Sequence, residues 1–174
     1  MSTTFARRTA AAGLTTAAAA AMLAGGVTGA AAAPSAGNSD LAAVRAATAQ
    51  FHDVGAAVAA GYIPVSDCEE LPGVGAMGIH YLNPQLASDG AVDPLRPEVL
   101  LYLPTGDDLQ LVGVEYFVAE AAAPSRPTVL GRPFDGPMPG HSAGMPSHYD
   151  LHLWIWKNNP AGVASAWNPA LSCN

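Results

Sequence analysis

Apolar side chains recur every three to four residues along the segment that begins near residue 40. The positions with this period are Leu41, Val44, Thr48, Phe51, Val54 and Val58. Such spacing predicts an amphipathic helix with one buried face. Ser39 or Asp40 can cap its start, and Gly61 can stop it just after Ala60. We therefore expect one N-terminal helix that ends at about residue 60.

Beyond Pro64 the pattern changes to short runs of β-branched and aromatic residues separated by Pro, Gly and Asp. The runs cover residues 77–82, 99–103, 109–118 and 149–157. Runs of this kind predict strands, and residues 98–103, apolar on both faces, predict a central one. The predicted fold class is α+β: one N-terminal helix packed on a small, mostly antiparallel β-sheet or partly closed β-barrel. Residues 40–174 form its single globular domain.

The segment 119–146 has a different composition. It contains six prolines and four glycines, which prevent long regular elements. Its apolar residues Phe134, Met138 and Met145 can anchor it to the rest of the domain. We predict a long, ordered Pro/Gly-rich loop that covers one face or the mouth of the sheet, because connections of this length are usually functional or disordered.

Residues 1–33 have the order of a secretory signal peptide. Arg7 and Arg8 precede an Ala-rich apolar stretch that ends in small residues before Pro34. The paired arginines leave the Sec and Tat export routes both open. An uncleaved membrane anchor is the alternative, but the stretch is short and interrupted by glycine. We expect a leader over residues 1–33, a flexible segment over 34–39, and a secreted, extracellular protein without stable membrane insertion after cleavage.

The composition supports this division of the chain. Half of the 174 residues are hydrophobic, and the mean hydropathy is +0.21, but much of the excess is alanine in the leader. Outside the leader there are five basic and 14 acidic residues. So few basic groups cannot neutralise a run of phosphates, which argues against nucleic acid as a partner. The sequence contains neither a P-loop nor a properly placed GxGxxG motif, so it predicts no nucleotide cofactor.

The chain has two cysteines, Cys68 and Cys173. In an oxidising compartment an isolated pair is most simply a disulfide. By the chain-entropy model, closing a loop of about 100 residues contributes about 4–5 kcal/mol. Metal ligation by the two thiols is the alternative, although no CxxC spacing supports it.

The segment from residue 147 to 156 concentrates side chains that can do chemistry. As a strand with a period of two, it places His148, Asp150 and His152 on one face, followed there by Trp154 and Trp156. Two imidazoles and a carboxylate would then share that face.

Two further residues can join this group from other predicted strands. His80 lies in the strand over residues 77–82, and Glu115 is a lone carboxylate in the apolar strand over 109–118. A buried carboxylate is costly unless it is paired with a cation, a donor or a metal. If the strands are neighbours, His80, Glu115, His148 and His152 can converge into a site with three nitrogens and one oxygen.

This ligand set suits a divalent transition metal such as zinc, iron, manganese or copper, and it is too nitrogen-rich for calcium or magnesium. Asp150 or Tyr81 would then hydrogen-bond to the metal ligands and fix their orientation. The alternative is structural: Glu115 pairs with one histidine and Asp150 orients another, without metal. His52 is expected at the helix boundary and not as a ligand. His141 lies on the Pro/Gly-rich loop, where it is expected to be solvated, although it could swing over the site.

Two functional alternatives from other classes stay open. One is a metal-free extracellular module in which Trp154, Trp156, Tyr81 and Phe117 line an apolar pocket for a small ligand or an envelope partner. The other is a purely structural secreted protein. The sequence does not choose between an enzyme and a binding protein, and it leaves the oligomeric state open.

Several of these segments also resemble a family of secreted bacterial proteins, mainly from actinobacterial-type, high-GC Gram-positive bacteria. The shared motifs are GMGxHY, LVGVEY and HYxLHxWxWxxNPxG, which stand here at residues 76–81, 111–116 and 148–162. The chain departs from them at Ala76, in place of glycine, and at Ala164, in place of phenylalanine. The family has no established activity, so the resemblance implies membership and places His80, Glu115, His148 and His152 in its motifs, but implies no mechanism.

Overall fold

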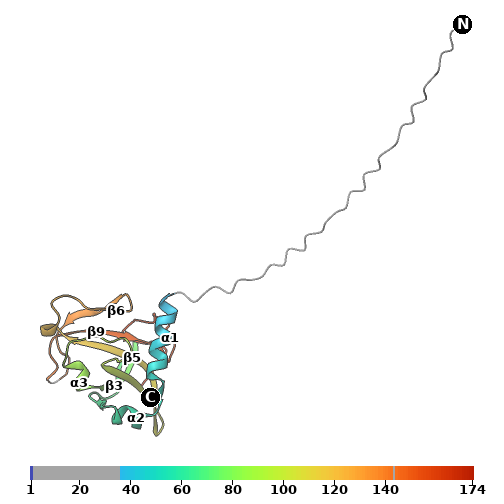
Figure 1. Cartoon of the computed structure of the whole chain (residues 1–174). Helices are drawn as coiled ribbons and strands as arrows, with labels where there is room; N and C mark the ends of the chain where they lie inside the picture. Colours follow the sequence, from blue (N-terminus) through green and yellow to red (C-terminus); the bar gives the residue numbers. More distant parts are fainter. Residues whose placement is uncertain (2–35, 143) are drawn as a thin grey trace. The chain divides into compact units, whose positions relative to one another are not determined.

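The fold is that of a computed structural model, which describes Met1 and residues 36–142 and 144–174. The predicted leader lies outside these residues, apart from Met1, as do positions 34 and 35 of the predicted flexible segment. The rest forms an α+β domain, with a helical N-terminal segment and a mostly antiparallel sheet (Figure 1). The predicted fold class is confirmed.

The helical segment begins earlier than predicted and is broken in the middle. Helix α1 spans Ala36–Thr48, a 3-10 helix η1 spans Ala49–His52, and α2 spans Val54–Ala59. The break falls at Asp53, whose backbone is extended and whose side chain accepts a hydrogen bond from the backbone N–H of Gly55. Asp53 therefore acts as the N-cap of a new helix, a local preference that overrides the continuous apolar period.

Seven strands form the main sheet, in the spatial order β1-β3-β4-β5-β9-β8, with β2 also paired to β3. Their bounds are Ile63–Pro64 (β1), Glu69–Leu71 (β2), Gly75–Leu82 (β3), Val99–Thr105 (β4), Asp108–Ala119 (β5), Asp135–Met138 (β8) and His148–Leu153 (β9). Within residues 36–142 and 144–174, all neighbouring strands are antiparallel, and the sheet does not close into a barrel. The predicted central strand is β4, which is buried from Val99 to Leu103.

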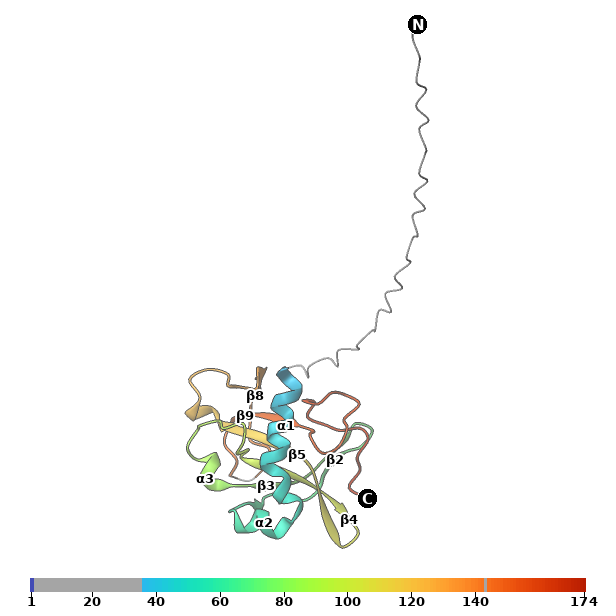
Figure 2. The same ribbon diagram turned by 45° about the vertical axis from the view of Figure 1, so that its right-hand side comes forward.

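The alternation of side chains along the strands gives the sheet two different faces. One face packs against α1, η1 and α2 and contains Leu100, Tyr102, Val114 and Tyr116 (Figures 1 and 2). The opposite face carries a smaller apolar cluster: Val99, Leu101, Leu103, Val112, Phe117 and Trp154. The polar strand residues predicted for the site lie on this second face, because the cross-strand pairs Val99↔Glu115 and Glu115↔His152 point to the same side.

The Pro/Gly-rich connection contains only short elements. These are η2 (Glu120–Ala122), β6 (Thr128–Val129), β7 (Arg132–Pro133) and β8, while α3 (Pro84–Ala87) lies outside it, after β3. Phe134 is fully buried in the helix-side core. Strand β9 ends at Leu153, four residues earlier than predicted, because the backbone N–H of Ile155 turns back to the carbonyl of Leu153.

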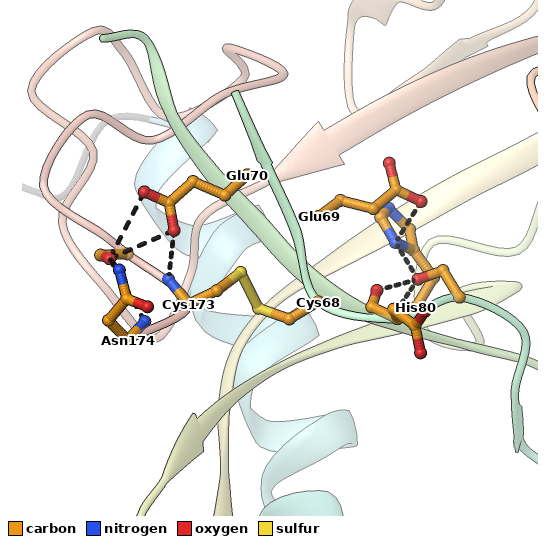
Figure 3. Close-up of a disulfide and its surroundings, with 9 residues drawn as sticks. Cys68, Glu69, Glu70, His80, Cys173 and Asn174 are labelled. Atoms are coloured by element: carbon orange, nitrogen blue, oxygen red, sulfur yellow. Dashed lines mark hydrogen bonds and ion pairs between the residues drawn. A yellow bond between two sulfur atoms is a disulfide. The ribbon is translucent and has the colours of Figure 1, made fainter. Parts of the chain in front are cut away.

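Cys68 and Cys173 form the predicted disulfide, with Cα atoms 5.9 Å apart (Figure 3). The bond joins the segment just before β2 to the C-terminus. Glu70 of β2 adds a second tie by accepting a hydrogen bond from the backbone N–H of Cys173 at 2.7 Å. Among the residues that the structure describes, no helix has both the length and the hydrophobicity needed to cross a membrane.

Candidate metal centre

Three strands bring His80, Glu115 and His152 together on the second face of the sheet. His80 comes from β3, Glu115 from β5 and His152 from β9. Glu115 is the direct cross-strand partner of His152, which is why these two side chains meet. The sheet brings together three of the four residues predicted as metal ligands.

The three side chains meet at one carboxylate oxygen. The Nε2 atom of His80 lies 3.3 Å from Oε2 of Glu115, and Nε2 of His152 lies 3.7 Å from the same oxygen. One ligand atom from each residue lies within 4.8 Å of the other two. Ligands of tetrahedral zinc, at about 2.0–2.1 Å from the ion, are about 3.3–3.4 Å apart. The two distances to Oε2 of Glu115 are thus close to the spacing of neighbouring ligands around a bound zinc ion.

Burial makes this arrangement costly for the protein on its own. The exposed fractions of His80, Glu115 and His152 are 9%, 5% and 2%. In the described part of the chain, Oε2 of Glu115 and both ring nitrogens of His152 have no hydrogen-bond partner. Buried polar atoms without partners are rare in proteins and call for a physical explanation.

The hydrogen bonds of His80 indicate which ring nitrogen faces Glu115. The Ser66 hydroxyl donates its single proton to the carbonyl of Asp67 at 2.7 Å. It lies 3.1 Å from Nδ1 of His80 and must accept there, so Nδ1 carries the ring proton. Neutral His80 therefore turns the lone pair of Nε2 toward Glu115.

Glu69 lies behind His80. One carboxylate oxygen of Glu69 is 3.6 Å from Nδ1 of His80 (Figure 3). Successive side chains of β2 point to opposite sides, so Glu69 faces His80 while Glu70 faces the C-terminus (Figure 3). A carboxylate and a hydroxyl on the outer nitrogen of a histidine are typical supports of a metal-binding imidazole. The sequence pattern did not indicate that Ser66 and Glu69 belong to the site. The adjacent Cys68 was the one residue near them that the pattern singled out.

The electrostatics of the group follow from burial. Desolvation lowers the pKa of His80 to about 4, with a smaller contribution from His141, and lowers the pKa of His152 to about 3. Desolvation also raises the pKa of Glu115 well above its ordinary value, and the charge of Asp150 adds to the effect. Both imidazoles are therefore neutral at pH 7, which is the form that binds a metal ion.

His148 belongs to a second group and not to the first. It gathers with His141 and Asp150, and one ligand atom from each lies within 4.8 Å of the others. His148 and His152 do share a face of β9, but four residues of strand separate them by about 13 Å along the chain. The predicted four-residue site is therefore divided, and His141, expected to be a solvated loop residue, joins His148.

The two predicted supporting residues also have different places. Asp150 lies on the site face, and its Oδ2 atom is 3.8 Å from Nε2 of His148. Tyr81 lies on the opposite face, with its ring 4.8 Å from that of Tyr102. The reason is the strand period, since Tyr81 follows His80 directly and must point the other way.

Two cavities open beside the ligand groups. A cleft of about 560 Å³ is bordered by His80, Glu115 and His141, and its apolar wall includes Phe117 and Met145. A second cavity, of about 410 Å³, reaches both groups through the side chains His80, Glu115, His152, His141 and Asp150. Loop residues 144–146 line the first cavity, as expected for a loop that covers the sheet.

The aromatic pocket predicted for a metal-free module is only partly formed. Phe117 lines the larger cleft, whereas Trp154 and Trp156 border a separate, smaller cavity beside Arg45. Trp156 packs against His52 on the helical side, with ring centres 4.3 Å apart. Because β9 ends at Leu153, the alternation that would place both tryptophans on the site face is lost: Trp154 packs in the second-face cluster, and Trp156 packs against the helix-side core.

Comparison of the chain with protein-family models, with curated proteins and with solved structures finds no match. The site's chemistry is therefore argued from its own residues. Its buried imidazole and carboxylate groups could hold a metal ion.

Proposed function

We propose that the protein is an exported metal-binding protein that holds a divalent transition-metal ion through His80, Glu115 and His152. One observation supports this above all. The buried Oε2 atom of Glu115 has no hydrogen-bond partner in the described residues, and two imidazole nitrogens lie 3.3 and 3.7 Å from it.

A metal ion accounts for this arrangement better than a structural ion pair does. A neutral His80 that carries its proton on Nδ1 presents a lone pair to Glu115, and a lone pair facing a carboxylate repels it. A proton on Glu115 would relieve one of these contacts but would leave His152 without a partner. A cation between the three atoms satisfies all of them at once, and the buried negative charge gains its counter-charge.

The donor set narrows the class of metal. Two imidazole nitrogens and one carboxylate oxygen suit zinc, iron, manganese or copper, whereas calcium and magnesium prefer oxygen ligands. Three protein ligands leave at least one coordination position for water or a small ligand. The cleft of about 560 Å³ borders two of the three ligands, so that position has room on this side.

The cellular setting is part of the proposal. The predicted leader indicates export, and the Cys68–Cys173 disulfide suits an oxidising compartment. The proposed placement in a secreted bacterial family rests on the sequence motifs at residues 76–81, 111–116 and 148–162.

A metal-free function has one observation in its favour. The larger cleft has an apolar wall that includes Phe117, and clefts of this size and character commonly hold small molecules. A small ligand with an apolar body would fit this wall, whether or not its head group contacted a metal ion.

The proposal is tested by thermal unfolding of the chelator-stripped full chain, with and without Zn²⁺. An ion present at about 100 times its dissociation constant stabilises the folded state by about 2.7 kcal/mol, and a chelator should reverse the effect. Glu115→Gln keeps the size of the side chain but loses its charge, and it should abolish most of the rise. His52→Gln, on the helical side, is the matched control and should leave it unchanged. A wild-type protein whose unfolding is insensitive to Zn²⁺, Mn²⁺, Fe²⁺ and Cu²⁺ would contradict the proposal.

A further inference from the structure

The second ligand group lies at the N-terminal end of β9, where the Pro/Gly-rich loop returns to the sheet. His148 and Asp150 come from β9, and His141 comes from the loop. His148 is fully buried, Asp150 is 6% exposed, and His141 lies at the surface. The group thus has two buried ligands and one that solvent can reach.

The orientation of the His148 ring is fixed from two sides. Its Nδ1 atom lies 3.0 Å from the carbonyl oxygen of Pro146, which can only accept, so Nδ1 carries the proton. The ring also stacks on Phe117, with centres 5.0 Å apart and planes 26° apart. The lone pair of Nε2 is therefore held in a defined direction, just as a hydrogen bond from the other ring nitrogen orients metal-binding imidazoles.

Nothing in the described residues uses that lone pair. Nε2 of His148 is buried without a hydrogen-bond partner. Its nearest charged atom is Oδ2 of Asp150 at 3.8 Å, too far for a hydrogen bond, and two acceptors facing each other do not attract. The His141 ring approaches from the loop side, with its centre 5.3 Å from that of His148.

The second group has the same kinds of side chain as the first group, two imidazoles and a carboxylate, but from different residues. A buried imidazole lone pair, a buried carboxylate and a further imidazole all have a ligand atom within 4.8 Å of one another. We propose that His141, His148 and Asp150 form a metal site of their own, which binds a second divalent transition-metal ion. Its two nitrogens and one oxygen favour the same class of metals as the first site.

The two sites would share one cavity. The cavity of about 410 Å³ is lined by Glu115 and His152 from the first group and by His141 and Asp150 from the second. Two ions bound there would lie in one cavity, each held by its own set of ligands.

The test is the metal content of the chelator-stripped full chain after loading with Zn²⁺ and removal of free ions. We expect two zinc ions per chain in the wild type and in the control His52→Gln. His148→Gln and His152→Gln should each retain one ion, and the double variant should retain none. Asp150→Asn changes the other ligand from β9 and should give the same result as His148→Gln. Near-ultraviolet circular dichroism checks that each variant is folded.

The outcomes separate this inference from the proposed function. One ion in the wild type, lost in His148→Gln but kept in His152→Gln, would support the second site and contradict the first. One ion that His148→Gln and Asp150→Asn both retain would overturn the second site and leave the first. One ion lost in either histidine variant would mean a single shared site and would overturn the inference. A wild type that binds none would overturn both.

Loading with Cu²⁺ tests whether the ions are neighbours. Two Cu²⁺ ions in one cavity should give a spin-coupled electron paramagnetic resonance signal, and His148→Gln should convert it to that of an isolated ion. Uncoupled signals at two ions per chain would place them apart and contradict the shared cavity.

Discussion

The two faces of the sheet bury most of their polar groups in different ways, although Nε1 of Trp156, on the helical side, also has no hydrogen-bond partner in the described residues. On the helical face, the hydroxyls of Tyr62, Tyr102 and Tyr116 each donate to a backbone carbonyl, at 2.7, 2.6 and 2.7 Å. On the other face, buried atoms of Glu115, His148 and His152 have no hydrogen-bond partner in the described residues. Satisfied groups stabilise a fold, whereas unsatisfied ones weaken it unless a ligand completes them. The difference supports the proposal that the second face binds a metal ion.

The two buried glutamates sharpen the comparison. Glu98 is 1% exposed, but its Oε2 atom accepts a hydrogen bond from the backbone N–H of Phe117, where β5 extends beyond the start of β4. Glu115 is similarly buried and faces two imidazoles. Glu98 thus has a structural partner within the chain, and Glu115 does not.

The largest expected effect concerns the disulfide that ties β2 to the C-terminus. We expect Cys68→Ser with Cys173→Ser to lower the free energy of unfolding by about 4–5 kcal/mol, because the bond closes a long loop in the unfolded chain. Urea unfolding measures the change. A reductant should weaken the wild type and leave the variant unaffected. A loss of less than about 1 kcal/mol in the free energy of unfolding would show that this disulfide does not hold the second face of the sheet in place.

The next effect is the pH dependence from Glu98. Burial raises its pKa from 4.5 to about 7, so the folded state keeps this proton where the unfolded state loses it. The contribution is most favourable below pH 4.5 and is lost as the pH rises to about 7, a change of roughly 3 kcal/mol.

Glu98→Gln should remove this part of the slope, measured as the free energy of urea unfolding between pH 4.5 and 7.5 in metal-free protein. Exposed Glu120→Gln is the control and should keep the wild-type slope. Identical slopes for Glu98→Gln and the wild type would contradict the assignment.

A smaller effect on the free energy of unfolding is expected for the tyrosines whose buried hydroxyls donate hydrogen bonds. Tyr102→Phe removes the hydroxyl that donates to the carbonyl of Phe51 and leaves that carbonyl without this donor. The expected loss is about 1–3 kcal/mol in the free energy of unfolding. Zinc content should not change, since the substitution lies on the helical face. A change in metal content without a change in stability would reverse the roles assigned to the two faces.

The smallest effect on stability is expected at the site itself. His152→Leu replaces a buried imidazole that has no hydrogen-bond partner in the described residues by an apolar side chain. We expect the metal-free protein to keep its stability or gain about 1 kcal/mol, because removing unpaired polar groups from a core is often neutral or favourable. Chemical denaturation with a chelator present measures this. A loss above about 2 kcal/mol would mean that His152 has a structural role.

The sequence predicted the strands around residues 77–82, 99–103 and 109–118 because alternation and β-branched content are local signals. It also singled out Glu115, since a carboxylate in an apolar strand has few explanations. It could not place His148, because a period of two gives the face of a residue but not its position along neighbouring strands. The same period could have excluded Tyr81, which follows His80.

Other parts of the site lay beyond the sequence pattern. His141, Ser66 and Glu69 come from a loop and from short segments whose paths depend on tertiary contacts. The helix break at Asp53 was readable in principle, because Asp is a favoured N-cap residue whose side chain accepts a hydrogen bond from a backbone N–H two or three residues later. The early end of β9 could not be predicted from the sequence. It depends on hydrogen bonds from the backbone N–H groups of Trp154 and Trp156 to the carbonyls of Val163 and Val112, respectively.

Anomalous diffraction from a crystal of the protein loaded with Zn²⁺ tests the proposed site of His80, Glu115 and His152 most directly. We expect an anomalous peak between Nε2 of His80, Oε2 of Glu115 and Nε2 of His152, about 2.0–2.1 Å from each atom. Full occupancy by water, or zinc bound only at other residues, would contradict it.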